Sequence, residues 1–468
     1  MEYVSTRGEA PALGFSDALL SGLARDGGLY VPREWPHFSE SEIRALRGRS
    51  YQEIAFAVLR PFLGGEIDDA TFRRIIDEAY ALFRHEAVCP LRQTAANEFI
   101  LELFHGPTLA FKDVAMQLLA RLMDHVLAER GQHATIVGAT SGDTGGAAVA
   151  AFAGSSRCDI FILFPHGRVS PVQQRQMTTA GAANVHALAI EGHFDDCQAI
   201  VKDMFNDHDF RDRLSLSGVN SINWARIMAQ IVYYFSSALS LGAPDRPVSF
   251  AVPTGNFGDI FAGYAAKRMG LPVERLVIAT NDNDILARAL ETGEYRTREV
   301  VATTSPSMDI QVSSNFERLL FEASGRRTAE VRGNMESLKQ SGGFTIASDT
   351  LAAIRADFMA GRSVLGETDS TIRLVKEKSD YLLDPHTATA VKVARSMPSS
   401  QAPTVILATA HPAKFPEAVS NASGVVPALP EWLGGLMERP ESFTVLSSEL
   451  KMVEEYVGRH ARAARERV

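Results

Sequence analysis

The stretch His105-Gly106-Pro107-Thr108-Leu109-Ala110-Phe111-Lys112-Asp113 joins a turn with glycine and proline to a long amphipathic pattern. Apolar residues follow it at helical spacing: Val114, Leu118, Leu122 and Val126, flanked by Leu119, Met123 and Leu127. We expect Asp113 to cap this helix and Lys112 to lie at its N-terminal end. The positive end of a helix disfavours an ammonium, so a neutral amine at Lys112 becomes easier to reach. A solvated surface lysine is the ordinary alternative, and other segments must decide.

A phosphate site would support a chemical role, because a neutral amine suits Schiff-base chemistry with a carbonyl cofactor. Residues 247–252 predict a short buried strand, and Pro253-Thr254-Gly255-Asn256-Phe257-Gly258-Asp259 follows it directly. Residues 260–269 then predict a helix, so the turn's N–H groups could converge on a phosphate. The chain has no GxxxxGK[ST] pattern, and this loop has no GxGxxG, which disfavours nucleotide binding. An ordinary strand-to-helix turn is the alternative for this loop alone.

A second loop, Gly138-Ala139-Thr140-Ser141-Gly142-Asp143-Thr144-Gly145-Gly146, follows a predicted strand at 135–137. A predicted helix at 147–153 and a strand at 159–164 complete a βαβ unit with parallel strands. Ser141, Thr144 and the N–H groups at the helix start suit a carboxylate or a phosphate. Tight packing of the helix on the sheet would explain the glycines without any ligand.

Together these segments resemble threonine synthase in its longer form, a family of pyridoxal-phosphate enzymes in the tryptophan-synthase-β-like (fold type II) group. The matching stretches are Tyr3-Val-Ser-Thr-Arg7-Gly8, Leu23-Ala-Arg-Asp26-Gly27-Gly28-Leu29-Tyr30, His105 to Asp113, Ala139 to Gly145, Ser221-Ile-Asn223-Trp224-Ala-Arg226-Ile227, Pro253 to Asp259, Ser307-Met-Asp309, Ser313-Ser-Asn315-Phe316-Glu317-Arg318, and Ala408-Thr409-Ala410-His411-Pro412-Ala-Lys414-Phe415. They cover almost the whole chain and show no departure at the motif positions. Beyond Phe415 no motif supports the resemblance.

The resemblance implies an α/β fold with two open, mostly parallel-sheet domains and a mainly helical N-terminal domain. The sequence pattern divides accordingly into an accessory region at 1–95, an α/β domain at 96–240 and another at 241–468. The third region includes a predicted strand at 404–408 and a mainly helical insertion at about 310–380. A polar segment at 325–341 within that insertion is expected at the periphery.

For the site, the resemblance implies that Lys112 binds pyridoxal 5'-phosphate covalently and that Thr409 contacts the pyridine nitrogen. Residues expected around the cofactor phosphate are Gly255, Asn256, Phe257, Gly258 and Asp259. A carboxylate beside a phosphate would repel it, so we expect Asp259 to cap the following helix instead.

The implied reaction converts O-phospho-L-homoserine and water to L-threonine and phosphate, the last step of threonine biosynthesis, by a carbon–oxygen lyase acting on a phosphate ester. Lys112 would serve as general base. The loop Ser141-Gly142-Asp143-Thr144-Gly145 is the candidate for the substrate carboxylate. Asn223 and Arg226, one helical turn apart, are the candidates for the leaving phosphate, and Arg168 and Lys414 are weaker ones.

Three alternatives stay open. A phospho-lyase of the same fold would release phosphate, ammonia and 2-oxobutyrate. A serine/threonine dehydratase would lack a pocket for a substrate phosphate. A non-catalytic protein that retains the fold is disfavoured by Lys112 and the glycine loop.

Composition fits a large enzyme with a small-molecule substrate. The 468 residues carry 47 basic and 56 acidic side chains, a net charge of −9 that argues against nucleic-acid binding. Cys89, Cys158 and Cys197 form no CxxC pattern and predict reduced thiols, and no HExxH or clustered spacing predicts a metal. His105 and His411 lie in matching motifs, and we assign neither to catalysis. The N-terminus resembles no secretion signal and no apolar run predicts a membrane span, so we expect a cytoplasmic protein, monomer or homodimer.

Overall fold

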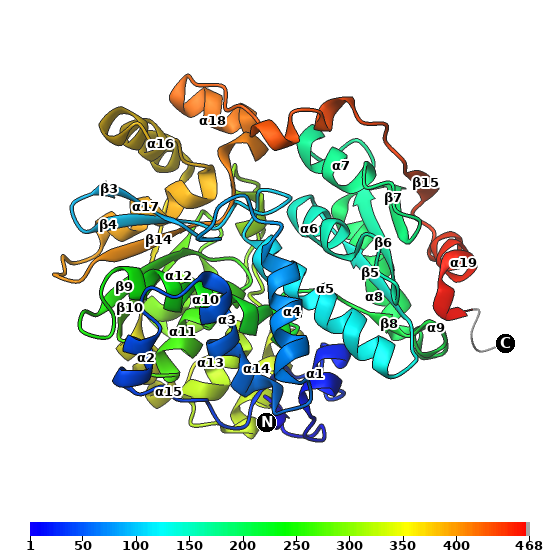
Figure 1. Ribbon diagram of the computed structural model, residues 1–468, viewed down its shortest axis with the longest axis horizontal. Helices are drawn as coiled ribbons and strands as arrows, with labels where there is room; N and C mark the ends of the chain where they lie inside the picture. Colours follow the sequence, from blue (N-terminus) through cyan, green and yellow to red (C-terminus); the bar gives the residue numbers. More distant parts are fainter. Residues whose placement is uncertain (465–468) are drawn as a thin grey trace.

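The computed structural model describes residues 1–464, which form an N-terminal region and two units built on separate sheets (Figure 1). The N-terminal region is mainly helical, with a small antiparallel pair of strands. Its elements are β1 (Tyr3–Ser5), α1 (Phe15–Ser21), β2 (Tyr30–Pro32), α2 (Glu40–Ala45), α3 (Tyr51–Leu59), η1 (Arg60–Leu63) and α4 (Asp69–Tyr80). Ser39 and Ser50 start α2 and α3 with reciprocal capping boxes to Glu42 and Glu53, which explains where these helices begin.

The larger sheet has six strands in the order β13-β10-β9-β14-β4-β3. These strands are β3 (Leu91–Ala95), β4 (Glu98–Glu102), β9 (Val248–Pro253), β10 (Val273–Thr280), β13 (Phe358–Arg362) and β14 (Thr404–Ala408). Every neighbouring pair is parallel except the β3–β4 hairpin. Helices cover both faces of such a sheet, and β9 is accordingly buried along its whole length.

The smaller sheet has five strands in the order β15-β7-β6-β5-β8, all of them parallel. These strands are β5 (Ala134–Ala139), β6 (Cys158–Pro165), β7 (Val185–Glu191), β8 (Leu216–Ser217) and β15 (Thr444–Ser447). The predicted βαβ unit is therefore present, with α6 (Asp143–Phe152) between β5 and β6. The predicted α/β class with mainly parallel sheets is confirmed.

The two sheets cross the domain boundaries that the sequence pattern suggested. The β3–β4 hairpin lies near residue 96 but pairs with β14 in the larger sheet. β15 lies beyond residue 241 but returns to pair with β7 in the smaller sheet. Sequence order does not decide which sheet a strand joins, because a parallel partner is reached through a crossover of any length.

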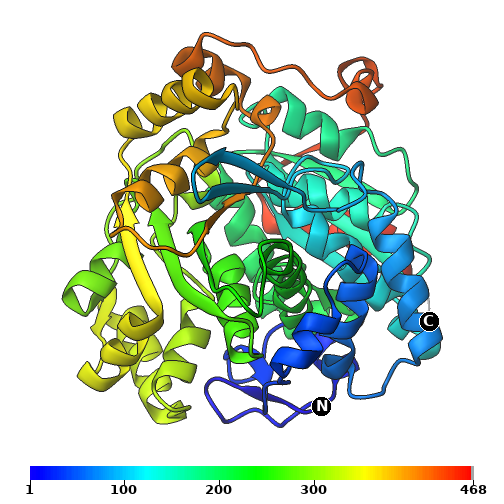
Figure 2. The same ribbon diagram turned by 60° about the vertical axis from the view of Figure 1, so that its left-hand side comes forward.

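Two long helices, α5 and α10, pack against each other between the two sheets. The helices of this central part of the chain are α5 (Lys112–Glu129), α7 (Pro171–Thr178), α8 (Phe194–Asn206), α9 (His208–Leu214), α10 (Trp224–Ser240) and α11 (Gly258–Arg268). α10 is buried along nearly its whole length and packs against α3, α5 and α11 (Figure 2). It therefore holds the N-terminal region and both sheet units in contact.

The remaining chain decorates the larger sheet and then returns to the smaller one. Its elements are α12 (Ile285–Thr292), β11 (Glu294–Arg296), η2 (Pro306–Met308), α13 (Phe316–Ala323), α14 (Thr328–Ser341), β12 (Gly343–Thr345), α15 (Ser348–Asp357), α16 (Leu365–Ser379), α17 (Pro385–Ser396), η3 (Pro412–Lys414), α18 (Pro416–Ser423), η4 (Glu431–Leu433), η5 (Leu436–Glu438), α19 (Leu450–His460) and η6 (Arg462–Ala464). α14 buries only Val331, as expected of the polar segment at 325–341. Among residues 1–464, no helix has the length and apolar character that crossing a bilayer requires.

Candidate active site

Lys112 is the first residue of α5, at the edge of the larger sheet where β14 ends. The turn before it is tied to the segment after β14 by two backbone hydrogen bonds. Phe111 N donates to Thr409 O at 2.9 Å, and His411 N donates to Leu109 O at 3.0 Å. Thr409 is buried, and its hydroxyl makes no hydrogen bond to another residue in 1–464. Lys112 and Thr409 are nearly 300 positions apart in the sequence, and these two hydrogen bonds hold the segments that contain them side by side.

The expected cap of α5 is not made by Asp113. The residue that precedes the helix is Phe111, and it provides no side-chain cap. Asp113 instead accepts from Thr108 N at 2.8 Å and from Thr108 Oγ1 at 2.7 Å, so it fixes the turn that leads into the helix. Burial raises the pKa of Asp113 to about 6, although both Thr108 donors oppose the shift.

The Gly255 loop runs from the end of β9 to the start of α11, as predicted. Two carbonyls of the loop are fixed by residues 313–315: Ser313 Oγ donates to Gly255 O at 2.6 Å, and Asn315 N donates to Asn256 O at 3.0 Å. The backbone N–H groups of residues 255–259 donate no hydrogen bond to another residue in the described chain. Five donors at a helix N-terminus are therefore free for an anion.

Two backbone features of this loop explain why its sequence is restricted. A side chain at Gly255 would place its Cβ only 2.7 Å from Ser307 O, so the close approach of these two segments requires glycine. Phe257 adopts a φ of 64°, which is unusual for a residue that is not glycine. Strain of this kind is found most often at ligand sites.

Asp259 does not cap α11, contrary to the expectation. Its Oδ1 accepts from the hydroxyls of Tyr233 and Tyr234, the second at 3.1 Å, and both tyrosines belong to α10. Its Oδ2 is buried and has no partner among residues 1–464. Burial raises the pKa of Asp259 to about 7, against the lowering effect of the tyrosine hydroxyls and of Lys112.

The second loop lies between β5 and α6 and divides into two kinds of residue. Thr140 Oγ1 accepts from Gly142 N at 2.9 Å and from Gly145 N at 3.0 Å. These two glycines, predicted to contact the substrate carboxylate, use their N–H groups to shape the loop and do not line the cavity. Ser141, Asp143 and Thr144 do line it.

Asp143 lies at the centre of a charged cluster that the sequence did not predict. Its carboxylate is 2.7 Å from Lys414 Nζ and 3.5 Å from Lys112 Nζ, and Gln173 Nε2 donates to it at 2.9 Å. Burial would raise the pKa of Asp143, but Lys414 and Lys112 outweigh it and hold that pKa far below its usual range. An anion this firmly ionised repels a substrate carboxylate, so Asp143 is unsuited to bind one.

The cluster leaves Lys112 with a depressed pKa. Burial lowers the pKa of Lys112, Asp143 opposes this shift, and Lys414 and Arg226 add to it. The lowered pKa of Lys112 was expected from the helix dipole, but its largest cause is the removal of the amine from water. Lys414 is wholly buried and donates to Thr108 O and Gln176 Oε1 as well as pairing with Asp143, so it is not available to a substrate phosphate.

Of the two residues predicted to bind the leaving phosphate, the structure places only Arg226 at the cavity. Asn223 is fully buried outside it, where its side chain caps α10 and donates to Leu19 O at 2.8 Å. Arg226 Nη1 donates to Val219 O at 2.9 Å, whereas its Nε is buried without a partner in the described residues. Burial lowers the pKa of Arg226 to about 10, so the guanidinium remains charged near neutral pH.

Ser307 and His386 are among the residues of the cavity wall that sequence reasoning missed. Ser307 N donates to His386 Nε2 at 3.3 Å, and Ser307 Oγ donates to Asp143 at 3.4 Å. His386 is held in turn by Asp384 at 3.0 Å. Ser307 lies in the matching stretch Ser307-Met-Asp309, which could have indicated it. His386 follows an Asp-Pro helix start, and no other feature of the sequence marks it. His105 and His411 lie outside this cavity.

These residues enclose a cavity of about 610 Å³ that opens between the two sheet units. Lys112, Thr409, residues 253–260 and residues 139–141 line it together. A buried lysine with a depressed pKa, five free N–H donors and a free hydroxyl fit the aldehyde, phosphate and ring nitrogen of pyridoxal phosphate.

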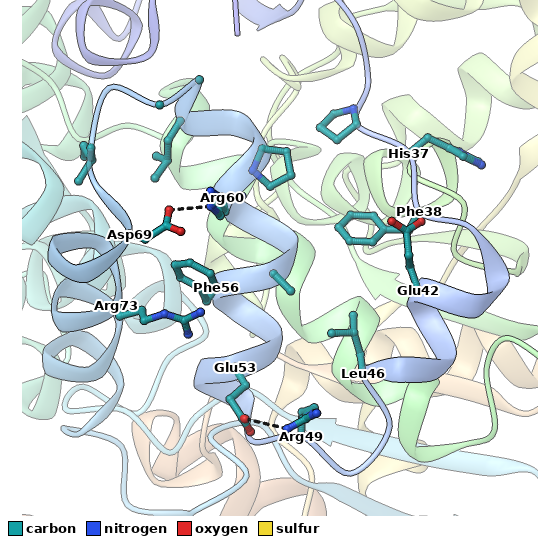
Figure 3. A pocket seen from close by; sticks show the side chains of 17 residues that line it. His37, Phe38, Glu42, Leu46, Arg49, Glu53, Phe56, Arg60, Asp69 and Arg73 are labelled. Carbon is teal, nitrogen blue, oxygen red and sulfur yellow. Dashed lines mark hydrogen bonds and ion pairs between the residues drawn. The ribbon is translucent and has the colours of Figure 1, made fainter.

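A larger cavity, of about 890 Å³, lies in the N-terminal region and contains none of these residues (Figure 3). Two ion pairs lie within it, Arg60 with Asp69 and Arg49 with Glu53. Arg73 lies 3.4 Å from the centre of the Phe56 ring. Size alone therefore does not locate the active site.

Sequence comparison agrees with this geometry. Residues 90–337 match the family described as pyridoxal-phosphate dependent enzyme, a span that contains both Lys112 and the Gly255 loop. The chain is thus a pyridoxal-phosphate enzyme of the fold-type II kind, and pyridoxal phosphate is its cofactor.

The flanking regions specify the family within that class. Residues 2–80 match the threonine synthase N terminus, and residues 387–457 match the threonine synthase C-terminal region. A threonine synthase of Pseudomonas aeruginosa is 54% identical over 98% of this chain and 98% of its own. The chain belongs to the threonine synthase family, and its activity is that of the family.

Solved structures support the same assignment. A structure described as pyridoxal-phosphate-bound threonine synthase from Brucella melitensis aligns with a TM-score of 0.98 at 72% identity, over 99% of this chain and 100% of that one. Yeast threonine synthase aligns with a TM-score of 0.94 at 39% identity, over 98% of each chain. A tomato threonine deaminase, at 12% identity and a TM-score of 0.52, shares the fold alone.

Proposed function

We propose that this chain converts O-phospho-L-homoserine and water to L-threonine and phosphate, with Lys112 as the residue that binds pyridoxal phosphate and moves protons. The observation that carries the proposal is the pairing of a buried lysine of depressed pKa with five unoccupied N–H donors across one cavity. Family membership supports the reaction.

For the cofactor, the N–H groups of residues 255–259 would hold its phosphate, and Thr409 would meet its ring nitrogen. A hydroxyl partner does not force that nitrogen to stay protonated, as a carboxylate would. When bound, the cofactor supplies an electron sink for the charge left at the substrate's Cα. Gly255 allows the close contact with Ser307 that shapes this end of the cavity.

For the substrate, Lys112 would remove the proton at Cα and then one at Cβ, so that phosphate can leave Cγ. Cγ would then take up a proton, and water would add at Cβ to give threonine. Ser141 and Thr144 line the cavity at the start of α6, where their N–H groups would suit the substrate carboxylate. Arg226 suits the leaving phosphate, since it is a buried guanidinium that lines the cavity.

Asp143 would serve these steps as a positioning residue. It lies between Lys112 and Lys414 and keeps both ammonium groups paired in a buried site. Because its charge favours the protonated form of Lys112, it limits how far burial depresses that pKa. The amine is thereby kept near the range in which it can both take and return a proton.

The organisation and setting of the enzyme are part of the same proposal. The N-terminal region, the unit on the smaller sheet and the unit on the larger sheet act as three domains, with the active site between the last two. We place the reaction in the cytoplasm, because Cys89, Cys158 and Cys197 are all buried and unpaired, as in a reducing compartment.

Incubation of the pyridoxal-phosphate-loaded protein with O-phospho-L-homoserine tests the reaction, with threonine and inorganic phosphate measured together. We expect equal amounts of both throughout the time course. Phosphate accompanied by 2-oxobutyrate and ammonia, without threonine, would instead show the phospho-lyase activity. Release of neither product would contradict both.

A further inference from the structure

Asp259 is a buried carboxyl at the place where the proposed function puts a phosphate. It lies in the first turn of α11 and lines the cavity together with the free N–H groups of the Gly255 loop. Both of its donors, the hydroxyls of Tyr233 and Tyr234, reach the same oxygen, Oδ1. Oδ2 is buried and makes no hydrogen bond within residues 1–464. A buried polar atom without a partner is rare and calls for a ligand or a proton.

The groups around Asp259 do not supply a compensating charge in contact with it. Tyr233 and Tyr234 come from α10, and burial raises the pKa of each well above its usual value, so both are neutral. Cys89 is a further buried neighbour, and burial also raises the pKa of its thiol. Lys112, from α5, is the cation that acts on Asp259. That cation is lost or delocalised once its amine is bonded to the cofactor.

We propose that Asp259 takes up one proton from solvent when the cofactor phosphate binds beside it. This inference rests on the proposed role of the Gly255 loop. Two anions placed side by side out of water cannot both stay ionised, and the carboxyl is the one that burial already disfavours. The proton neutralises the carboxyl whose Oδ2 is buried without a partner among residues 1–464.

The proposal predicts a linkage between pH and cofactor affinity. The pKa of Asp259 is about 7 in the empty protein, so the carboxyl is ionised at pH 8 and protonated at pH 6. The loaded protein binds one more proton above pH 7, and affinity for pyridoxal phosphate therefore falls as pH rises. Asp259→Asn removes this dependence, because a neutral amide of the same shape needs no proton.

Calorimetric titration with pyridoxal phosphate, in buffers of different ionisation enthalpy, counts the protons taken up. We expect the wild type to take up close to one proton more per site than Asp259→Asn at pH 8, and no more than the variant at pH 6. Asp259→Asn should also bind about tenfold more tightly than the wild type at pH 8. Equal proton counts at pH 8 would overturn the proposal, as would weaker binding by the variant at both pH values.

A second variant keeps the proposal testable if Asp259→Asn does not fold. Tyr234→Phe removes a donor that lowers the pKa of Asp259, so the proton uptake should shift to higher pH. Infrared difference spectra at pH 8 should show a protonated carboxyl appearing on loading, and no such band in Asp259→Asn. Absence of the band in the wild type would contradict the proposal.

Asp113→Asn is the matched control, since Asp113 is another buried carboxyl near Lys112 but does not line the cavity. Its pKa of about 6 leaves it ionised at pH 8, and we expect this variant to keep the wild-type proton count. Failure of the proposed function is distinguishable. If the wild type does not bind pyridoxal phosphate, the site itself is wrong, whereas binding without the extra proton contradicts only the role of Asp259.

Discussion

At the scale of single residues, the buried charges of the cavity divide into those that are paired and those that are not. Lys414 and Asp143 satisfy one another, while Arg226 keeps an unused donor in a buried position. A buried cation is costly unless an anion arrives, so we expect Arg226, which lines the cavity, to receive the leaving phosphate.

Replacement of Arg226 by Gln tests this assignment. A lost charged hydrogen bond of about 1.5–3 kcal/mol corresponds to a decrease in kcat/KM of roughly 10- to 150-fold for O-phospho-L-homoserine. Steady-state kinetics on the loaded enzyme measure it. Arg168→Gln is the control, because Arg168 is exposed and does not line the cavity, and it should behave as the wild type. Equal kinetics for both variants would remove Arg226 from the substrate site.

The same residues show what could be read from the sequence. Lys112, the Gly255 loop and Thr409 lie together as expected, because each follows directly from a strand or helix end that its local pattern marks. The capping roles expected for Asp113 and Asp259 were wrong, whereas the substrate contact expected of Asn223 stays a prediction for a residue that lies outside the cavity. Each was assigned from its position beside a helix start, whereas Asp113 and Asp259 are held by partners the local pattern does not reveal, and Asn223 is buried away from the cavity.

At the scale of elements, we expect the Gly255 loop to bind the cofactor phosphate through its backbone, so the geometry of the loop matters more than its side chains. The carbonyl of Ser307 approaches Gly255 so closely that a methyl group would displace one of the two segments. The turn between β9 and α11 therefore depends on the 3-10 turn η2 for its shape.

Gly255→Ala should weaken binding of pyridoxal phosphate at least tenfold, since its Cβ would lie 2.7 Å from a backbone oxygen. Fluorescence or absorbance titration gives the dissociation constant. Gly333→Ala in α14 is the control, because nothing lies within 4 Å of its Cβ. This control should leave affinity unchanged and stabilise the helix by about 0.5–1 kcal/mol. An unchanged dissociation constant for Gly255→Ala would show that the loop is not held so tightly.

The existence of an element was well predicted where its apolar pattern was long, as for α5 and β6. The short strands β8 and β15 escaped prediction, because β8 has only two residues and β15 has no fully buried residue. Such strands are defined by the partner they pair with and not by their own composition.

At the scale of the whole molecule, the chain returns at its C-terminal end to complete the unit that contains the SGDTG loop. β15 pairs with β7, and α19 packs on α8 (Figure 1). Arg462 then donates from Nε to the buried carboxylate of Asp159 at 2.8 Å, and its backbone N donates to the same group. This return explains why linear domain boundaries misplace the last strand.

Arg462→Ala should destabilise the smaller sheet by about 1–3 kcal/mol, because it leaves a buried carboxylate short of a charged donor. Hydrogen exchange of β6 amides reports this local change, with β9 amides as the internal reference. Arg459→Ala is the control, since Arg459 is 73% exposed and its ion pair with Glu455, across one helical turn, is worth less than about 1 kcal/mol. If Arg462→Ala changed the exchange rates of the β6 amides no more than those of the β9 amides, Arg462 would not stabilise the smaller sheet as described.

The account depends most on one amine being bonded to the cofactor beside an anion site made by a distant segment. Borohydride reduction of the loaded enzyme fixes the pyridoxyl group to whichever amine holds it, and peptide mass spectrometry then locates that amine. The account predicts a single labelled site, Lys112, and no label after Lys112→Ala, with Lys202→Ala labelled as the wild type. Label on Lys414 or on any other lysine, or a fully labelled Lys112→Ala, would contradict it.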